Sequence, residues 1–112
     1  MQAAKTIFCD IDGVIFKHEG EGACNQWSGV HTLLPGIKEA FNVWEKAGYC
    51  IVLVTSRKES CRALLEEELR VEQLFWDHLI MGLPHGERII INDRKKDGPS
   101  VSSVLVERNS GL

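Results

Sequence analysis

The chain has 112 residues, 44% of them hydrophobic and 26% charged, with a net charge of −3 at pH 7. This length and composition fit one globular domain over residues 1–112 and leave no room for a second. The slight acidity and a pI of about 5.8 argue against a nucleic-acid partner. No apolar stretch approaches the ~20 residues of a membrane span, and the amino end resembles no signal peptide, so we expect no membrane partner and a cytoplasmic protein.

The first apolar run, Thr6–Cys9, ends in two closely spaced carboxylates, Asp10 and Asp12, followed by Gly13. Alternate residues of a strand share a face, so the two acids converge on one site only if the strand ends or bends between them, and Gly13 permits the bend. Two such carboxylates repel unless a cation lies between them or one holds a proton. The pair therefore indicates a divalent-metal site with one nucleophile and one acid/base group, although an isolated pair also fits a plain acidic loop.

An irregular stretch rich in Gly and Glu, 16–32, follows and is typical of a flap over a site. Apolar residues then recur at spacings of three and four from Ile37 to Ala47, which predicts a helix that ends at Gly48. Four cysteines, Cys9, Cys24, Cys50 and Cys61, lack both metal-ligand spacing and a disulfide framework, so we expect reduced thiols.

The second half alternates strand-like and helix-like patterns. Cys50–Val54 is a continuous apolar run typical of a central parallel strand, and it stops at Thr55-Ser56-Arg57. A helix is predicted from Glu59 or Ser60, with Cys61, Leu64, Leu65 and Leu69 facing inward and the Glu run facing solvent. The remaining predicted strands are His78–Met81, Arg88–Ile91 ending in Asn92-Asp93, and an edge strand over Val101–Val106.

This alternation predicts an α/β fold with a central, mostly parallel sheet. Ligands of open α/β sheets bind at the carboxyl ends of the strands, so the polar groups that follow three of the runs should meet there. Carboxylate and amide oxygens suit Mg²⁺, and a hydroxyl with a guanidinium suits phosphate.

At these motifs the chain resembles the haloacid dehalogenase-like (HAD) superfamily of phosphohydrolases. The first motif is similar to Asp10-Ile11-Asp12-Gly13-Val14, the second to Thr55 after its apolar strand, and the acidic fourth motif to Ile90-Ile91-Asn92-Asp93. The resemblance implies a three-layer Rossmann-like core with no inserted cap and a short flap. More narrowly, 79–86, 91–95 and 108–112 look like small capless members linked to capsule or surface-polysaccharide biosynthesis.

The resemblance also implies a role for each residue. Asp10 would attack phosphorus, and Asp12 would protonate the leaving oxygen and later activate water. Mg²⁺ would be held by Asp10, the Asp12 carbonyl and Asp93, with Asn92 a weaker ligand or an orienting group. Phosphoryl oxygens would be bound by Thr55, Ser56, Arg57 and Lys95.

Two departures from the family pattern keep a second hypothesis open. Leu83 stands where related small members carry a lysine, so Arg57, Lys95, Arg88 or Lys58 must supply that charge, with Arg57 the first choice. Asn92 replaces an Asp, which weakens metal binding.

From the motifs together, we expect a Mg²⁺-dependent phosphatase for a small phosphorylated metabolite such as a sugar phosphate. We expect it to act as a homo-oligomer because the flap is short. The alternative is a non-catalytic phosphate- or metal-binding module. A receiver-like signalling domain is disfavoured because here the acidic pair leads the chain.

Overall fold

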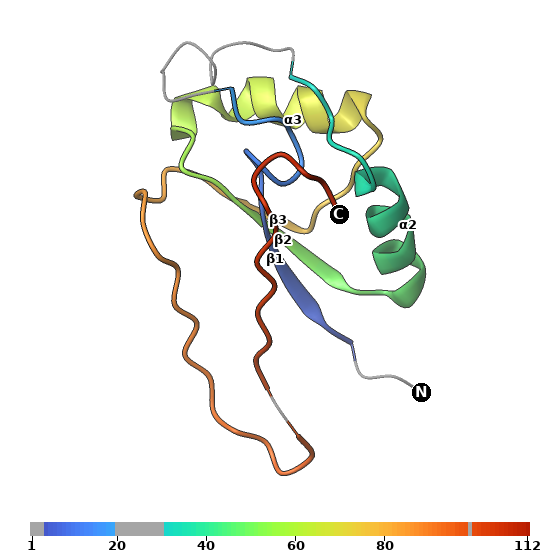
Figure 1. Cartoon of the computed structure of the whole chain (residues 1–112), viewed down its shortest axis with the longest axis vertical. Coiled ribbons are helices and arrows are strands. Elements are labelled where there is room, and N and C mark those ends of the chain that lie inside the picture. The colour runs from blue at the N-terminus through green and yellow to red at the C-terminus, as the bar shows by residue number, and fades with distance from the viewer. Residues whose placement is uncertain (1–3, 20–30, 99) are drawn as a thin grey trace.

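A parallel three-stranded sheet forms the centre of the computed structural model, which describes residues 4–19, 31–98 and 100–112 (Figure 1). The strands are β1 (Thr6–Asp10), β2 (Cys50–Val54) and β3 (His78–Ile80), in the order β1-β2-β3. Asp10 pairs with Val54, and Val54 with Ile80, so all three strands end at the same edge of the sheet. The protein is thus a small α/β fold with a parallel sheet, as the alternating pattern predicts.

Two α-helices connect these strands. Helix α2 (Ile37–Ala47) leads from β1 to β2, and α3 (Arg62–Val71), preceded by the short 3₁₀ turn η1 (Glu59–Cys61), leads from β2 to β3. Both crossovers advance in the same direction along the sheet, so right-handed connections place both helices on one face. The core between them is made of aliphatic and aromatic side chains that include Ile37, Phe41, Ile51, Leu53, Leu65 and Leu69.

The expected inward face of the second helix is correct except at one position. Cys61, Leu65 and Leu69 are fully buried, but Leu64 is 39% exposed. The buried acid Glu68 lies on the inward face instead. This difference matters for the site because it brings a carboxyl group to the inward face of α3.

The predicted strands Arg88–Ile91 and Val101–Val106 are wrong, since the structure has no strand at either place. Residues 84–98 and 100–107 instead form an arm that leaves the carboxyl end of the sheet, turns at a tip and returns (Figure 1). The physical reason is the connection: a parallel strand needs a crossover of a dozen or more residues, and only 81–87 separate β3 from Arg88. The molecule is accordingly elongated, with extents of 47 × 29 × 25 Å.

Both ends of the arm are fixed to the body. At its start, the Leu83 N–H donates to the Thr55 carbonyl at 3.1 Å. At its end, the Leu112 N–H donates to the Pro35 carbonyl at 2.9 Å, and a Cβ added at Gly36 would lie 1.9 Å from the Leu112 carbonyl oxygen. Only glycine at 36 permits this close approach.

The remaining expectations are tested only in part. No helix among the described residues has the length and apolar character to cross a membrane. The described cysteines, Cys9, Cys50 and Cys61, form no disulfide bond, whereas Cys24 lies outside the described residues. Most of the predicted flap, 16–32, also lies outside them, since the structure describes only its two ends.

Candidate functional site

The turn after β1 brings Asp10 and Asp12 to the carboxyl end of the sheet. The Ile11 side chain is fully buried, and its carbonyl accepts hydrogen bonds from the backbone N–H groups of the next turn, the shortest from Ile15 at 2.8 Å. Gly13 adopts a positive φ of 91°, which glycine tolerates best. The strand therefore ends between the two acids, as it must if both side chains are to point into one site.

The Asp10 carboxylate is partly buried and accepts the Ile11 N–H at 3.0 Å. Burial raises the pKa of Asp10 above its ordinary value, and the Asp12 charge acts in the same direction. The Ile11 hydrogen bond and the charges of Arg88 and His18 oppose this rise in the pKa. Asp10 thus carries an incompletely compensated charge and has the cation Arg88, from the start of the arm, acting on it.

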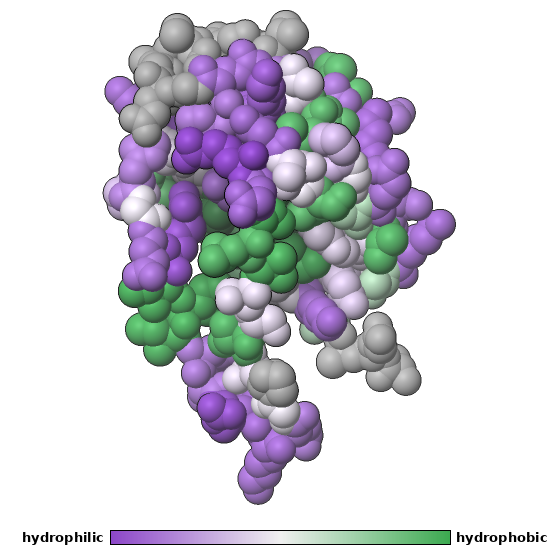
Figure 2. Space-filling view, viewed as in Figure 1, coloured by the Kyte–Doolittle hydropathy of each residue, from purple (hydrophilic) through white to green (hydrophobic). Residues whose placement is uncertain are grey.

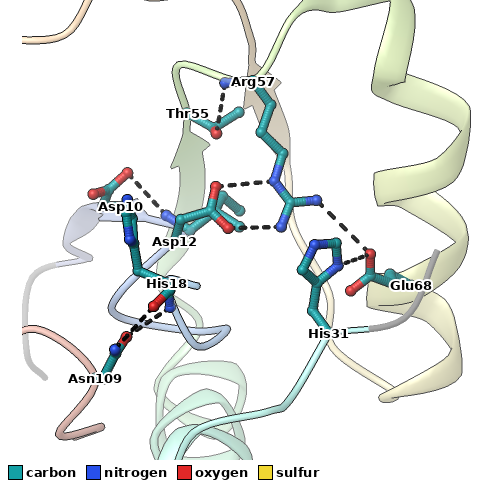
Figure 3. Close-up of polar contacts among 9 residues, drawn as sticks. Asp10, Asp12, His18, His31, Thr55, Arg57, Glu68 and Asn109 are labelled. Atoms are coloured by element: carbon teal, nitrogen blue, oxygen red, sulfur yellow. Dashed lines mark hydrogen bonds and ion pairs between the residues drawn. The ribbon is translucent and has the colours of Figure 1, made fainter. Parts of the chain in front are cut away.

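Arg57 binds Asp12 with both arms of its guanidinium group (Figure 3). Nε donates to Asp12 Oδ2 at 2.9 Å and Nη2 donates to Oδ1 at 2.7 Å. The Arg57 side chain is only 3% exposed. Burial alone would lower the pKa of Arg57, but the hydrogen bond and charge of Asp12, together with the Glu68 charge, raise it. Arg57 therefore fixes the orientation of Asp12.

Two residues that the sequence did not single out extend this ion pair. Glu68 of α3 lies 3.8 Å from Arg57 Nη1 and is 2.6 Å from His31 Nδ1 (Figure 3). Glu68 is 7% exposed, and its Oε2 has no hydrogen-bond partner among the described residues. Glu68 follows the buried Leu65 by three residues, and this helical spacing is the signal that could have placed it inside.

Asn109, from the end of the chain, holds the segment that follows the acidic pair. Its Oδ1 accepts the His18 N–H at 2.6 Å and its Nδ2 donates to the His18 carbonyl at 3.1 Å (Figure 3). Its own N–H donates to the Gly13 carbonyl at 2.8 Å. No short-range pattern predicts a contact 91 residues apart. Asn109 is thus a positioning residue for the turn that carries Asp12.

Thr55 and Ser56 lie at the end of β2, beside the acidic turn. Thr55 is 1% exposed, and its hydroxyl oxygen accepts the Arg57 N–H at 3.1 Å (Figure 3). Ser56 is partly exposed. The structure therefore brings five of the predicted site residues together: Asp10, Asp12, Thr55, Ser56 and Arg57. Within this group Thr55 is buried, and the Arg57 guanidinium group forms ion pairs with Asp12 and Glu68.

The other predicted site residues lie on the arm. Lys95 Nζ contacts both carboxylate oxygens of Asp93 at 2.8 Å, and Asn92 donates to the Ser100 carbonyl at 3.4 Å. All of these side chains are exposed. Asn92, Asp93 and Lys95 thus bond within the arm rather than to the acidic pair at the end of β1.

The metal ligands expected from sequence are consequently not assembled within one chain. The described residues hold no group of three or more His, Cys, Asp or Glu side chains placed to bind a metal ion. Since Arg57 occupies the Asp12 carboxylate, one chain offers the Asp10 carboxylate and the Asp12 carbonyl. Mg²⁺ is commonly bound through one or two carboxylates, with water and substrate phosphate as its other ligands, so these two groups would hold the ion only in part.

Comparison with known proteins gives structural likenesses only. No family model and no curated protein matches the sequence. A chain of the Pnkp1/Rnl/Hen1 complex superimposes with a TM-score of 0.61 at 22% identity over 70% of this chain and 27% of that one. A chain of the Pnkp1/Rnl/Hen1 RNA repair complex gives the same score and identity over 84% of this chain and 28% of that one. These likenesses establish the fold alone.

A third solved structure is of similar size to this chain. It is a structural-genomics target from Vibrio cholerae, with a TM-score of 0.55 and 18% identity over 81% of each chain. By contrast, this chain spans little more than a quarter of the chains from the RNA repair complex. The common feature is therefore an α/β unit that also occurs within much longer chains.

Proposed function

We propose that this chain is a phosphomonoester hydrolase of the HAD-like type that forms an aspartyl-phosphate on Asp10. The observation that carries the proposal is the turn at the end of β1. It places a partly buried Asp10 and an oriented Asp12 at the carboxyl end of a parallel sheet, beside the polar end of β2. This is the edge where open α/β sheets bind ligands.

In the proposed first step, an Asp10 carboxylate oxygen bonds to phosphorus as the bond from phosphorus to the leaving alkoxide oxygen breaks. Asp12 delivers a proton to that oxygen. The Arg57 fork occupies one lone pair on each Asp12 oxygen, and the other lone pair on each remains for a proton. Arg57 thereby orients Asp12 and still leaves each of its carboxylate oxygens a lone pair that can hold a proton.

In the second step, Asp12 removes a proton from water, and the resulting hydroxide oxygen attacks the phosphorus of the aspartyl-phosphate. The bond to the Asp10 oxygen breaks, inorganic phosphate leaves, and Asp10 is restored. Arg88, whose charge already lowers the pKa of Asp10, is the cation best placed to offset the incoming anion in the role that Leu83 cannot fill. Mg²⁺, when bound, would be held in part by the Asp10 carboxylate and the Asp12 carbonyl and would neutralise negative charge on the phosphoryl group.

The substrate class that we propose is a small phosphorylated metabolite such as a sugar phosphate. Linkage to capsule or surface-polysaccharide biosynthesis rests on the sequence resemblance at 79–86, 91–95 and 108–112. The likeness to chains of an RNA repair complex adds a phosphorylated RNA end to the substrates worth testing, although the net charge of −3 disfavours a polyanion.

The test is hydrolysis of para-nitrophenyl phosphate, a panel of sugar phosphates and a phosphorylated oligoribonucleotide in the presence of Mg²⁺. We expect wild-type turnover on at least one ester, and its loss in Asp10→Asn. Glu39→Gln is the matched control because it removes one exposed carboxylate from the first turn of α2. Wild-type activity no greater than that of Asp10→Asn on every ester would refute the proposal.

A non-catalytic binding module is the second candidate. It is favoured by the ion pairing of Arg57 and by the incomplete metal ligands of one chain. This candidate predicts that Mg²⁺ and vanadate bind at Asp10 without any turnover. Titration calorimetry beside the hydrolysis assay separates the two candidates.

A further inference from the structure

The arm exposes a long apolar surface. Ile89 is 74% exposed, Ile91 93%, Val104 82% and Leu105 99%. Figure 2 shows this apolar band between the hydrophilic tip of the arm and the body. Contiguous apolar surface of this kind on a soluble protein marks an interaction site.

The sheet carries a matching unpartnered surface. Within the part of the chain that the structure describes, β1 is an edge strand because it pairs only with β2, and the two helices cover one face of the sheet. On the other face, Phe8 of β1 is 53% exposed and Ile80 of β3 is 42% exposed. An open strand edge beside exposed apolar side chains is a template for adding a further strand.

The arm does not fill this place in its own chain, and the connection that would bring it there is short. To lie parallel to β1 on its free edge, Ile89–Ile91 would have to start beyond the amino end of the sheet, three strand spacings from β3. That displacement is about 14 Å across and about 16 Å along the strands, or about 22 Å in a straight line through the protein. The nine residue steps from Ile80, the end of β3, to Ile89 reach about 30 Å at full stretch. Because the chain has to pass around the sheet and its side chains, this connection would have little slack.

The direction of the arm fits a second copy instead. Its first half runs from the carboxyl end of the sheet past the body, opposite to the strands (Figure 1). A two-fold axis perpendicular to the strands reverses that direction, so the same segment would run parallel to β1 of the other copy. No backbone–backbone hydrogen bond joins 87–92 to any other described residue, so this segment is extended and available for pairing.

We propose that two copies of this chain exchange their arms, each adding Ile89–Ile91 as a strand to the free edge of β1 in the other copy. In parallel register this exchange carries Asn92 and Asp93, which directly follow the new strand, to the carboxyl end of β1 and thus to Asp10 of the other copy. The metal ligands missing from one chain are then supplied by the second. The dimer is inferred from the exposed arm alone, whereas the shared metal site also depends on the proposed function.

Charge complementarity supports the exchange. The tip of the arm carries Arg94, Lys95 and Lys96 against two acids, Asp93 and Asp97, so its net charge is positive. The carboxyl end of the sheet carries Asp10, Asp12 and Glu68, of which only Asp12 and Glu68 contact Arg57. A basic tip delivered to this acidic edge is favourable, and it brings Lys95, a predicted phosphate ligand, to the site.

The first test is the molar mass in solution, measured by light scattering over the concentration range of the activity assay. We expect a dimer for wild type and at least a roughly tenfold weaker dimer for Ile91→Lys, since a lysine there buries a charge at the new interface. Ile91 is almost fully exposed in the single chain, so this substitution leaves the fold of each copy intact. Val71→Lys on α3, which is 69% exposed, is the matched control and should remain dimeric.

The second test mixes two inactive variants, Asp10→Asn and Asp93→Asn, after dissociation and reassociation. Half of the dimers are mixed, and each mixed dimer has one site with Asp10 from one copy and Asp93 from the other, so about a quarter of wild-type activity returns. If both residues of a site came from the same chain, mixing would restore nothing.

A monomeric wild type, or a dimer that Ile91→Lys leaves unchanged, would overturn the exchange. A dimer that Ile91→Lys disrupts, with no hydrolysis by wild type, would support the exchange and refute the proposed function. Failure of the two variants to complement, with wild type both dimeric and active, would overturn the shared site.

Discussion

Replacing Arg57 with Met tests the ion-pair network at the centre of the site. Methionine keeps an unbranched side chain but removes the guanidinium group from Asp12 and Glu68, together with its contact to the Phe16 ring at 6.0 Å. Removing one partner of a buried ion pair typically costs 3–5 kcal/mol, because the other charge is left uncompensated. Here the Asp12 side chain is 28% exposed and Glu68 retains His31, so we expect the lower end, a loss of about 3 kcal/mol.

The loss is measured by urea unfolding, as a lower midpoint with an unchanged denaturant slope, and it corresponds to a fall of about 10 °C in the melting temperature. Arg57→Lys keeps the charge but cannot form two parallel bonds, so it should recover only part of the stability. Arg70→Met is the matched control: its partner Glu67 is 70% exposed, and such pairs contribute about 1 kcal/mol or less.

A loss below about 1 kcal/mol for Arg57→Met would refute the buried network, because that is the range of exposed pairs. The double variant Arg57→Met with Asp12→Asn closes a thermodynamic cycle. Coupling of at least about 1 kcal/mol is expected if the two side chains contact each other as described.

Four further predictions follow from the site and its supports. Because burial raises the pKa of Asp10, the folded state binds that proton more tightly than the unfolded state, so stability falls as pH rises from the ordinary value of 3.8 to the raised value. Asp10→Asn should therefore unfold at a higher urea concentration than wild type at pH 7. A variant no more stable than wild type would contradict this. Arg88→Met removes a charge that lowers the pKa of Asp10, so the low-pH limb of the hydrolysis rate should move to higher pH, and an unchanged profile would show that Arg88 does not act there. Asn109→Gly tolerates the left-handed φ of 67° but loses both side-chain hydrogen bonds to His18, so the free energy of unfolding should fall by about 2 kcal/mol. An unchanged free energy of unfolding would mean that these two hydrogen bonds are not formed. Burial, with the Asp10 charge, raises the pKa of Cys9 to about 12, so iodoacetamide should label it in the native state far more slowly than the partly exposed Cys50, as peptide mass spectrometry would report.

The sequence predicted the elements whose folding is decided by local pattern. The continuous apolar run at Cys50–Val54 became the buried central strand, and the periodic segment from Ile37 became α2 up to Gly48. The bend at Gly13 was also predictable, because two acids at the end of an apolar run need it to share a site.

The failures concern geometry that local pattern does not encode. Ile89–Ile91 has the composition of a buried strand, but the short connection after β3 denies it a place in its own sheet. Arg57 has the chemistry of a phosphate ligand, but Glu68 and Asp12 reach it first from segments 11 and 45 residues away in the sequence. Side chains brought together over such separations are visible only in three dimensions.

The central claim is that Asp10 accepts a phosphoryl group. The most direct measurement is mass spectrometry of wild-type protein quenched in acid during turnover of para-nitrophenyl phosphate, followed by sequencing of the modified peptide. If Asp10 is the nucleophile, wild type carries one added phosphoryl group on Asp10 and Asp10→Asn carries none. A phosphoryl group on any other residue, or turnover that persists in Asp10→Asn, would contradict it.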